Sequence, residues 1–68
     1  MINEFQPRFV KKEDMAELFN LYHLARTALA GTNPTNYQRV IWASIEFAKQ
    51  KKMNATAVYK DLSDAISW

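Results

Sequence analysis

Three stretches of this chain place their apolar residues at the spacing of an α-helix, and only short polar breaks separate them. They predict helices over residues 13–30, 34–51 and 55–67. The main apolar stripes are Met15, Leu18, Phe19, Tyr22, Ala25 and Leu29; then Tyr37, Val40, Ile41, Ser44, Phe47 and Ala48; and then Ala55, Val58, Tyr59, Leu62, Ala65 and Ile66. Because no stretch alternates convincingly as a strand would, the sequence predicts an all-α three-helix bundle.

The breaks between these stretches carry residues that commonly end and begin helices. Gly31 is expected to close the first helix in the left-handed conformation. Asn33 is expected to cap the second helix, with Pro34 as its first residue. Asn54 is expected to cap the third helix.

Residues 1–12 are the least regular part of the chain, and Pro7 breaks any helix through them. We expect an extended arm that lays some of its aromatic side chains on a single helical domain formed by residues 13–68. A disordered arm that folds against a partner is the alternative.

The chain is short, which limits the core that it can build. Its 68 residues make one domain at most, and a domain of this size buries only about 60% of its unfolded surface. There is no cysteine and a single histidine, so helix packing or association must supply the remaining stability. The lack of cysteine suits a reducing compartment. With no signal peptide and no apolar run of about 20 residues, we expect a cytoplasmic protein without a membrane span.

Residues that could support catalysis or metal binding are sparse. His23 has no second ligand at suitable spacing. The three carboxylates between residues 13 and 17 are better explained by the helix dipole at the start of the first helix. Asp61 and Asp64 lack the further group and the pocket that a catalytic pair needs. We therefore expect no enzyme activity, no catalytic residue, no cofactor, no metal and no small-molecule substrate.

Residues 48–62 read as the end of one helix, a tight polar turn and the start of the next. The first helix carries a small residue, Ala48, and an aliphatic residue, Met53, follows the turn. Asn54 is a short polar cap for the next helix, and the pair Val58 and Tyr59 packs that helix inward, with Leu62 one turn later. This pattern resembles the helix-turn-helix of the lactose-repressor, resolvase and related bacterial families. Lys52 replaces the glycine of their turn, and a left-handed residue other than glycine costs about 1 kcal/mol or more.

The resemblance implies a DNA-binding regulator that acts as a dimer, because one such unit reads few base pairs. Its phosphate contacts would be Arg39, Lys49, Lys51 and Lys52, and its base contacts would include Thr56 and Lys60. The acids of the last helix, Asp61 and Asp64, would oppose docking of its C-terminal half. The lysines are equally explained as a solvated helix C-terminus that the dipole favours. Residues 36–44 and 57–60 look like those of small accessory proteins of bacteriophages and prophages.

Two surfaces favour a second hypothesis, a protein-interaction module or an inhibitor of a host or partner protein. Trp42 lies about 160° from the centre of its helix's apolar face, and tryptophan is enriched at interface hot spots. It shares the far side with Arg39, Glu46 and Lys49. Packing of Trp42 under the N-terminal arm is the alternative. The other surface is a second stripe on the first helix, Leu21, Leu24 and Ala28.

Overall fold

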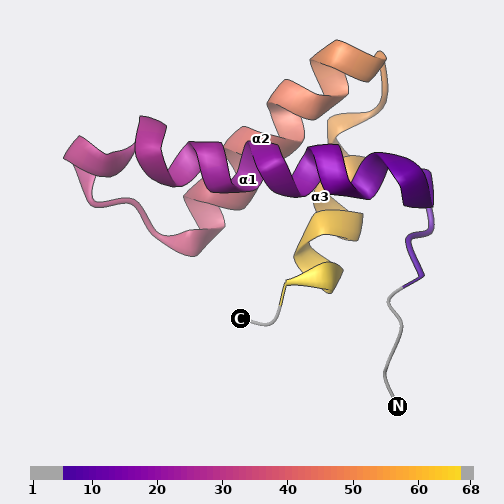
Figure 1. The fold of residues 1–68 in the computed structure, drawn as a ribbon, viewed down its shortest axis with the longest axis horizontal. Coiled ribbons are helices and arrows are strands. Elements are labelled where there is room, and N and C mark those ends of the chain that lie inside the picture. The colour runs from indigo at the N-terminus through magenta and orange to yellow at the C-terminus, as the bar shows by residue number, and fades with distance from the viewer. Residues whose placement is uncertain (1–5, 67–68) are drawn as a thin grey trace.

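The computed structural model describes residues 6–66, and within that range it contains three α-helices and no strand (Figure 1). α1 spans Met15–Ala28, α2 spans Asn36–Lys51 and α3 spans Ala55–Ala65. Two 3-10 turns, Lys12–Asp14 and Ala30–Thr32, flank α1. The predicted all-α fold with three helices is confirmed. Helix α3 was expected to reach residue 67, but it ends at Ala65, because the next residue, Ile66, already has an extended backbone.

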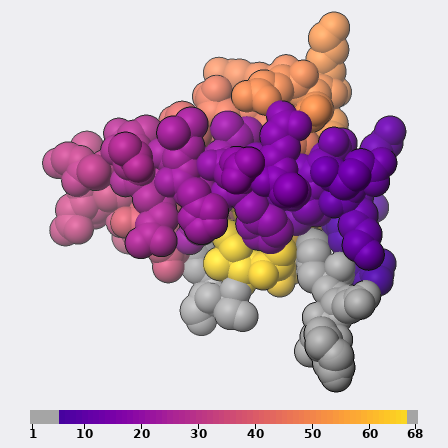
Figure 2. Space-filling view, viewed as in Figure 1, coloured from indigo at the N-terminus to yellow at the C-terminus, as the bar shows by residue number. Residues whose placement is uncertain are grey.

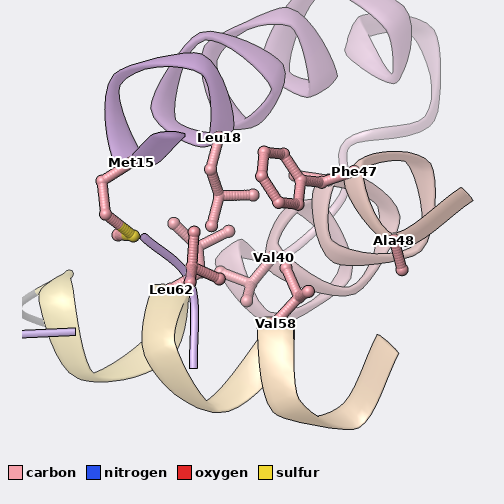
Figure 3. Packing of buried hydrophobic residues seen from close by; sticks show 9 residues of the cluster. Met15, Leu18, Val40, Phe47, Ala48, Val58 and Leu62 are labelled. Carbon is pink, nitrogen blue, oxygen red and sulfur yellow. The ribbon is translucent and has the colours of Figure 1, made fainter. Parts of the chain in front are cut away.

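α2 is the central helix, because both α1 and α3 pack extensively against it. Figure 1 shows α1 lying across the other two helices, and Figure 2 shows α1 covering most of the face seen in this view. Side chains from all three helices meet in one core, where Leu18, Val40, Phe47, Val58 and Leu62 are fully buried (Figure 3). None of the helices in the described part of the chain is long and apolar enough to cross a membrane.

The start of α2 differs from the prediction. Its cap is Thr35, whose side-chain oxygen accepts a hydrogen bond from the Gln38 backbone N–H at 3.2 Å. The Gln38 side chain accepts one in return from the Thr35 backbone N–H at 3.1 Å. This reciprocal capping box satisfies two donors at once. The predictions that Asn33 caps the helix and that Pro34 begins it are therefore wrong.

The end of α1 also differs from the prediction, which placed it at residue 30 with a left-handed Gly31. The helix ends at Ala28, and Gly31 lies inside the following 3-10 turn with no positive φ. Thr32 tightens that turn, because its backbone N–H and its hydroxyl both donate to the Leu29 carbonyl, at 3.0 and 2.8 Å. The left-handed residue is Asn33, with a φ of 53°, and asparagine tolerates this conformation better than most residues.

The turn between α2 and α3 has the expected features. Lys52 is left-handed, with a φ of 56°. The Met53 N–H donates to the Ala48 carbonyl at 2.9 Å, which is the six-residue hydrogen bond of a Schellman motif. The Asn54 side-chain oxygen caps α3 by accepting from the N–H groups of Thr56 and Ala57, at 2.8 and 3.3 Å. The expectation that Asn54 caps the third helix is confirmed.

The described end of the N-terminal arm is held by its backbone. The N–H groups of Arg8, Phe9 and Val10 all donate to the carboxylate of Asp61 on α3, at 3.0, 2.7 and 2.6 Å. Asp61 is only 1% exposed and Val10 is buried. Phe9, in contrast, is 48% exposed, so this aromatic ring does not pack on the body as expected. Phe5 lies outside the described residues.

Candidate functional site

The outer face of α2 is unusually apolar for a surface. At about 100° per residue, Trp42 and Ile45 lie on the far side of the helix from its buried residues Val40 and Phe47. Ile45 is 40% exposed, while Ile41 and Trp42 are partly buried. α1 and α3 cover the two flanks of α2. The apolar residues of α2 that contact neither helix therefore lie on its solvent side.

A hollow of about 200 Å³ lies on one side of this outer face, between α2 and α3. It is lined by Tyr37, Ile41, Ser44, Ile45, Ala55, Thr56 and Tyr59. The rings of Tyr37 and Tyr59 meet edge to face with their centroids 6.1 Å apart, and Tyr37 is 57% exposed. The two tyrosines thus connect the helices at the surface and leave apolar edges open to solvent.

A second hollow, of about 300 Å³, lies on the other side of the same face. Its lining comes from α2 and from the segment that connects α1 to α2: Leu29, Thr32, Pro34, Gln38, Ile41, Trp42 and Ile45. Ile41 and Ile45 belong to both hollows, so the two hollows flank one continuous surface. We call the residues Tyr37, Gln38, Ile41, Trp42 and Ile45 the α2 face. Neither hollow has a charged lining residue among the described residues.

The first hollow contains one buried polar group without a partner. The Oγ atom of Ser44 makes no hydrogen bond within residues 6–66, and Ser44 is 1% exposed. A buried hydroxyl left unpaired costs about 1–3 kcal/mol. Ser44 therefore places an unpaired hydroxyl in the wall of this uncharged hollow.

Trp42, for which partner contact and packing under the N-terminal arm were the two alternatives, is partly buried and packs against the core. Its neighbours in the second hollow, Leu29 and Pro34, belong to the α1–α2 connection. The described part of the arm instead binds Asp61 on α3. Trp42 therefore both packs on the core and lines the second hollow beside the α2 face.

The charged residues predicted to surround Trp42 are engaged within the chain. An Nη atom of Arg39 donates to the side chain of Asn36 at 3.1 Å, and Lys49 lies 3.8 Å from Glu46. The Arg39–Asn36 hydrogen bond is exposed, and the Lys49 side chain is 70% exposed. Exposed interactions of this kind contribute about 0–1 kcal/mol, so they leave these side chains able to take other partners.

The second predicted stripe on α1 is divided between core and surface. Leu21 packs against the core. Leu24, which is 52% exposed, and Ala28 are at the surface, one turn apart. The exposed part of this stripe consequently consists of Leu24 and Ala28.

The lysines predicted to bind DNA differ in their surroundings. Lys51 turns to α1, where it pairs with Glu17 at 3.1 Å and lies over the Phe47 ring at 5.9 Å. Lys52, Thr56 and Lys60 are exposed around the start and middle of α3. Within the described residues, the two lysines make no ion pair.

Sequence analysis missed two functionally relevant features. It assigned Tyr37 and Ile41 to the inner face of α2, although they line the surface, and it did not place Asp61 inside the molecule. A signal for Asp61 is present in the sequence. It follows the buried Val58 by three residues and precedes the partly buried Ala65 by four, so it lies on the same face of α3 as both. The apolar residues of α2 likewise extend over more than half of its circumference, as expected for a central helix.

Comparisons with models of known protein families, with curated proteins and with solved structures found no match to this chain. The local resemblance of residues 48–62 to bacterial helix-turn-helix motifs therefore has no support from a matching family. The turn does keep two features that the resemblance implies, a left-handed residue at Lys52 and a capping Asn54. What the protein does is inferred from its own residues and surface.

Proposed function

We propose that this protein is a protein-interaction module that binds its partner through the α2 face. One observation carries the proposal: Ile41 and Ile45 lie at the surface between two hollows whose linings hold no charged residue among those described. Continuous apolar surfaces on small proteins commonly mark interaction sites. Burying this face against a partner would remove apolar area from water at about 25 cal/mol per Å².

The composition of the α2 face supports this proposal. Interface cores are depleted in charge and enriched in aromatic residues, and the α2 face contains Tyr37 and Trp42 but no charge. The charged side chains Arg39, Glu46 and Lys49 lie on the same helix beside it, as the polar rim of an interface would. The face is thus organised as an apolar centre with a charged border.

A capture experiment with two matched variants tests this proposal. The full chain, Ile45→Asp and Leu24→Asp are immobilised and exposed to native lysate treated with nuclease. Both substitutions place a carboxylate on an exposed apolar position of a helix, one on the α2 face and one on the α1 stripe. We expect the wild type and Leu24→Asp to retain the same proteins and Ile45→Asp to lose them. Equal retention by all three, or loss only from Leu24→Asp, would contradict the proposal.

DNA binding through residues 48–62 is the second candidate function, and two observations favour it. The backbone of the turn has the left-handed residue and the helix cap that the motif implies. The charge of Asp61 is buried against the arm, so it does not face a ligand at the outer surface of α3. Asp64 remains exposed and would still repel phosphate.

Duplex binding at low salt tests the second candidate. If DNA is bound, a Lys52→Ala/Lys60→Ala variant should bind more weakly at all sequences, and each lost phosphate contact should lower the salt slope by about 1. Lys12→Ala, an exposed lysine before α1, is the control and should bind as the wild type does. No binding by the wild type in low salt would exclude this function.

A further inference from the structure

We propose that the partner on the α2 face is a second copy of this chain, with the two α2 helices packed antiparallel about a two-fold axis near Trp42. This inference rests on the proposed function and names the partner. It is carried by the spacing of the residues on the outer face and by the charges beside them.

The outer side of α2 has the residue spacing of a helix–helix contact. Gln38, Trp42, Ile45 and Lys49 follow one another at intervals of four, three and four residues. This is the spacing of the a and d positions of a coiled coil. In an antiparallel pair whose two-fold axis lies between residues 43 and 44, Trp42 of each copy lies against Ile45 of the other. The polar ends meet as well, with Gln38 opposite Lys49.

The flanking charges are self-complementary in this arrangement. Arg39 and Glu46 are seven residues apart, so they lie on the same flank of α2, two turns from each other. A two-fold antiparallel pair brings Arg39 of each copy next to Glu46 of the other. In a parallel pair this flank would instead face the opposite flank of the other helix, which carries Ile41 and Ala48 and offers neither charge a partner. The charge pattern therefore favours the antiparallel dimer.

Both charged side chains are available for such contacts. Among residues 6–66, Glu46 pairs only with Lys49, at 3.8 Å, and its side chain is 35% exposed. The hydrogen bond from Arg39 to Asn36 is at the surface, and the Nε atom of Arg39 is buried without a partner in the described residues. One helix face offers less than the roughly 800 Å² per partner of a standard interface. We therefore expect a dimer with a dissociation constant on the order of micromolar or weaker.

Charge exchange gives the first test, by sedimentation equilibrium of the full chain up to millimolar concentration. The wild type should dimerise. Arg39→Glu and Glu46→Arg should each weaken dimerisation by about tenfold or more, because each places two pairs of like charges at the interface. The double variant should dimerise again, as should an equimolar mixture of the two single variants. Lys60→Glu, the same kind of charge change at an exposed position of α3, should behave as the wild type does.

Cysteine cross-linking gives a second test that does not depend on those variants. Since the chain has no cysteine, a disulfide can form only where one is introduced. In the antiparallel dimer, Gln38→Cys and Lys49→Cys should cross-link when the two variants are mixed. Each alone should cross-link poorly, because its two copies lie far apart along the helix.

A wild type that stays monomeric up to millimolar concentration overturns the dimer, and so does a double variant that fails to recover. Preferential cross-linking of Gln38→Cys with itself would show a parallel pair and would also overturn it. If the wild type is monomeric but still captures other proteins in a way that depends on Ile45, the dimer fails and the proposed function stands. If Ile45→Asp alters neither dimerisation nor capture, both fail.

Discussion

The carboxylate of Asp61 accepts a hydrogen bond from the backbone N–H of Val10 at 2.6 Å, inside the molecule. The same carboxylate accepts from Arg8 and Phe9, so one side chain of α3 satisfies three donors of the N-terminal arm. Hydrogen bonds to a charged acceptor contribute about 1.5–3 kcal/mol each. Asp61 therefore fixes the arm to the bundle and lets a short chain add Val10 to its core.

Replacing this carboxylate by an amide should release the arm. Asp61→Asn keeps the size but turns one acceptor oxygen into a donor that faces backbone N–H groups. We expect a loss of about 3 kcal/mol in the free energy of unfolding, measured in urea. Hydrogen exchange should show faster exchange at the amides of residues 8–10.

Asp64→Asn is the matched control for that change, because Asp64 is an exposed acid one turn along the same helix. It should change the free energy of unfolding by less than about 0.5 kcal/mol. Equal effects of the two substitutions would show that the contact with the arm does not stabilise the fold.

Replacing the left-handed Lys52 by glycine should increase the stability of the fold. Because a side chain in this conformation is strained and glycine is not, Lys52→Gly should raise the free energy of unfolding by about 1 kcal/mol. Gln50→Gly, at an exposed position in the last turn of α2, should lower it by about 1 kcal/mol. Thermal unfolding of the two variants side by side measures the difference in sign.

The cap of α2 can be assigned by mutation. Thr35→Ala removes the acceptor for the Gln38 N–H and should cost about 1 kcal/mol in the free energy of unfolding. Asn33→Gly should be neutral or stabilising, because Asn33 only has to be left-handed. A large loss from Asn33→Gly with none from Thr35→Ala would restore the cap that the sequence predicted.

The unpaired hydroxyl of Ser44 makes a further prediction. Ser44→Ala removes a buried polar atom that has no hydrogen-bond partner in the described residues. The variant should be as stable as the wild type or more stable by up to about 1 kcal/mol. A clear loss of stability in chemical denaturation would mean that the hydroxyl has a partner.

Local patterns predicted the helices and the turn after α2 well, because apolar spacing and capping chemistry are properties of short segments. Asn54 caps α3, and Lys52 takes the left-handed conformation that ends α2. The connection before α2 was harder, because Gly31, Asn33 and Thr35 are all good candidates for a helix boundary. The choice among them depended on the Gln38 side chain accepting from the Thr35 N–H and on the Thr32 hydroxyl donating to the Leu29 carbonyl, and this is decided by the folded geometry.

The candidate site could be predicted only in part. Trp42 was identified as lying away from the main apolar stripe, but Tyr37 and Ile41 were assigned to the core. When apolar residues extend over more than half of the circumference of a helix, the number of helices that pack against it decides which of them remain at the surface. The broad apolar surface of α2 indicates that more than one element packs on it, but which elements cover which flank is a property of the tertiary fold.

Site-specific cross-linking at the α2 face tests the central claim most directly. A photoreactive phenylalanine analogue is introduced in place of Ile45 in the full chain, and in place of Leu24 as the matched control on α1. The account predicts covalent adducts to protein from position 45, either a second copy of this chain or another partner, and few from position 24. Adducts from position 24 alone, or none from position 45 in conditions where the protein associates, would contradict it.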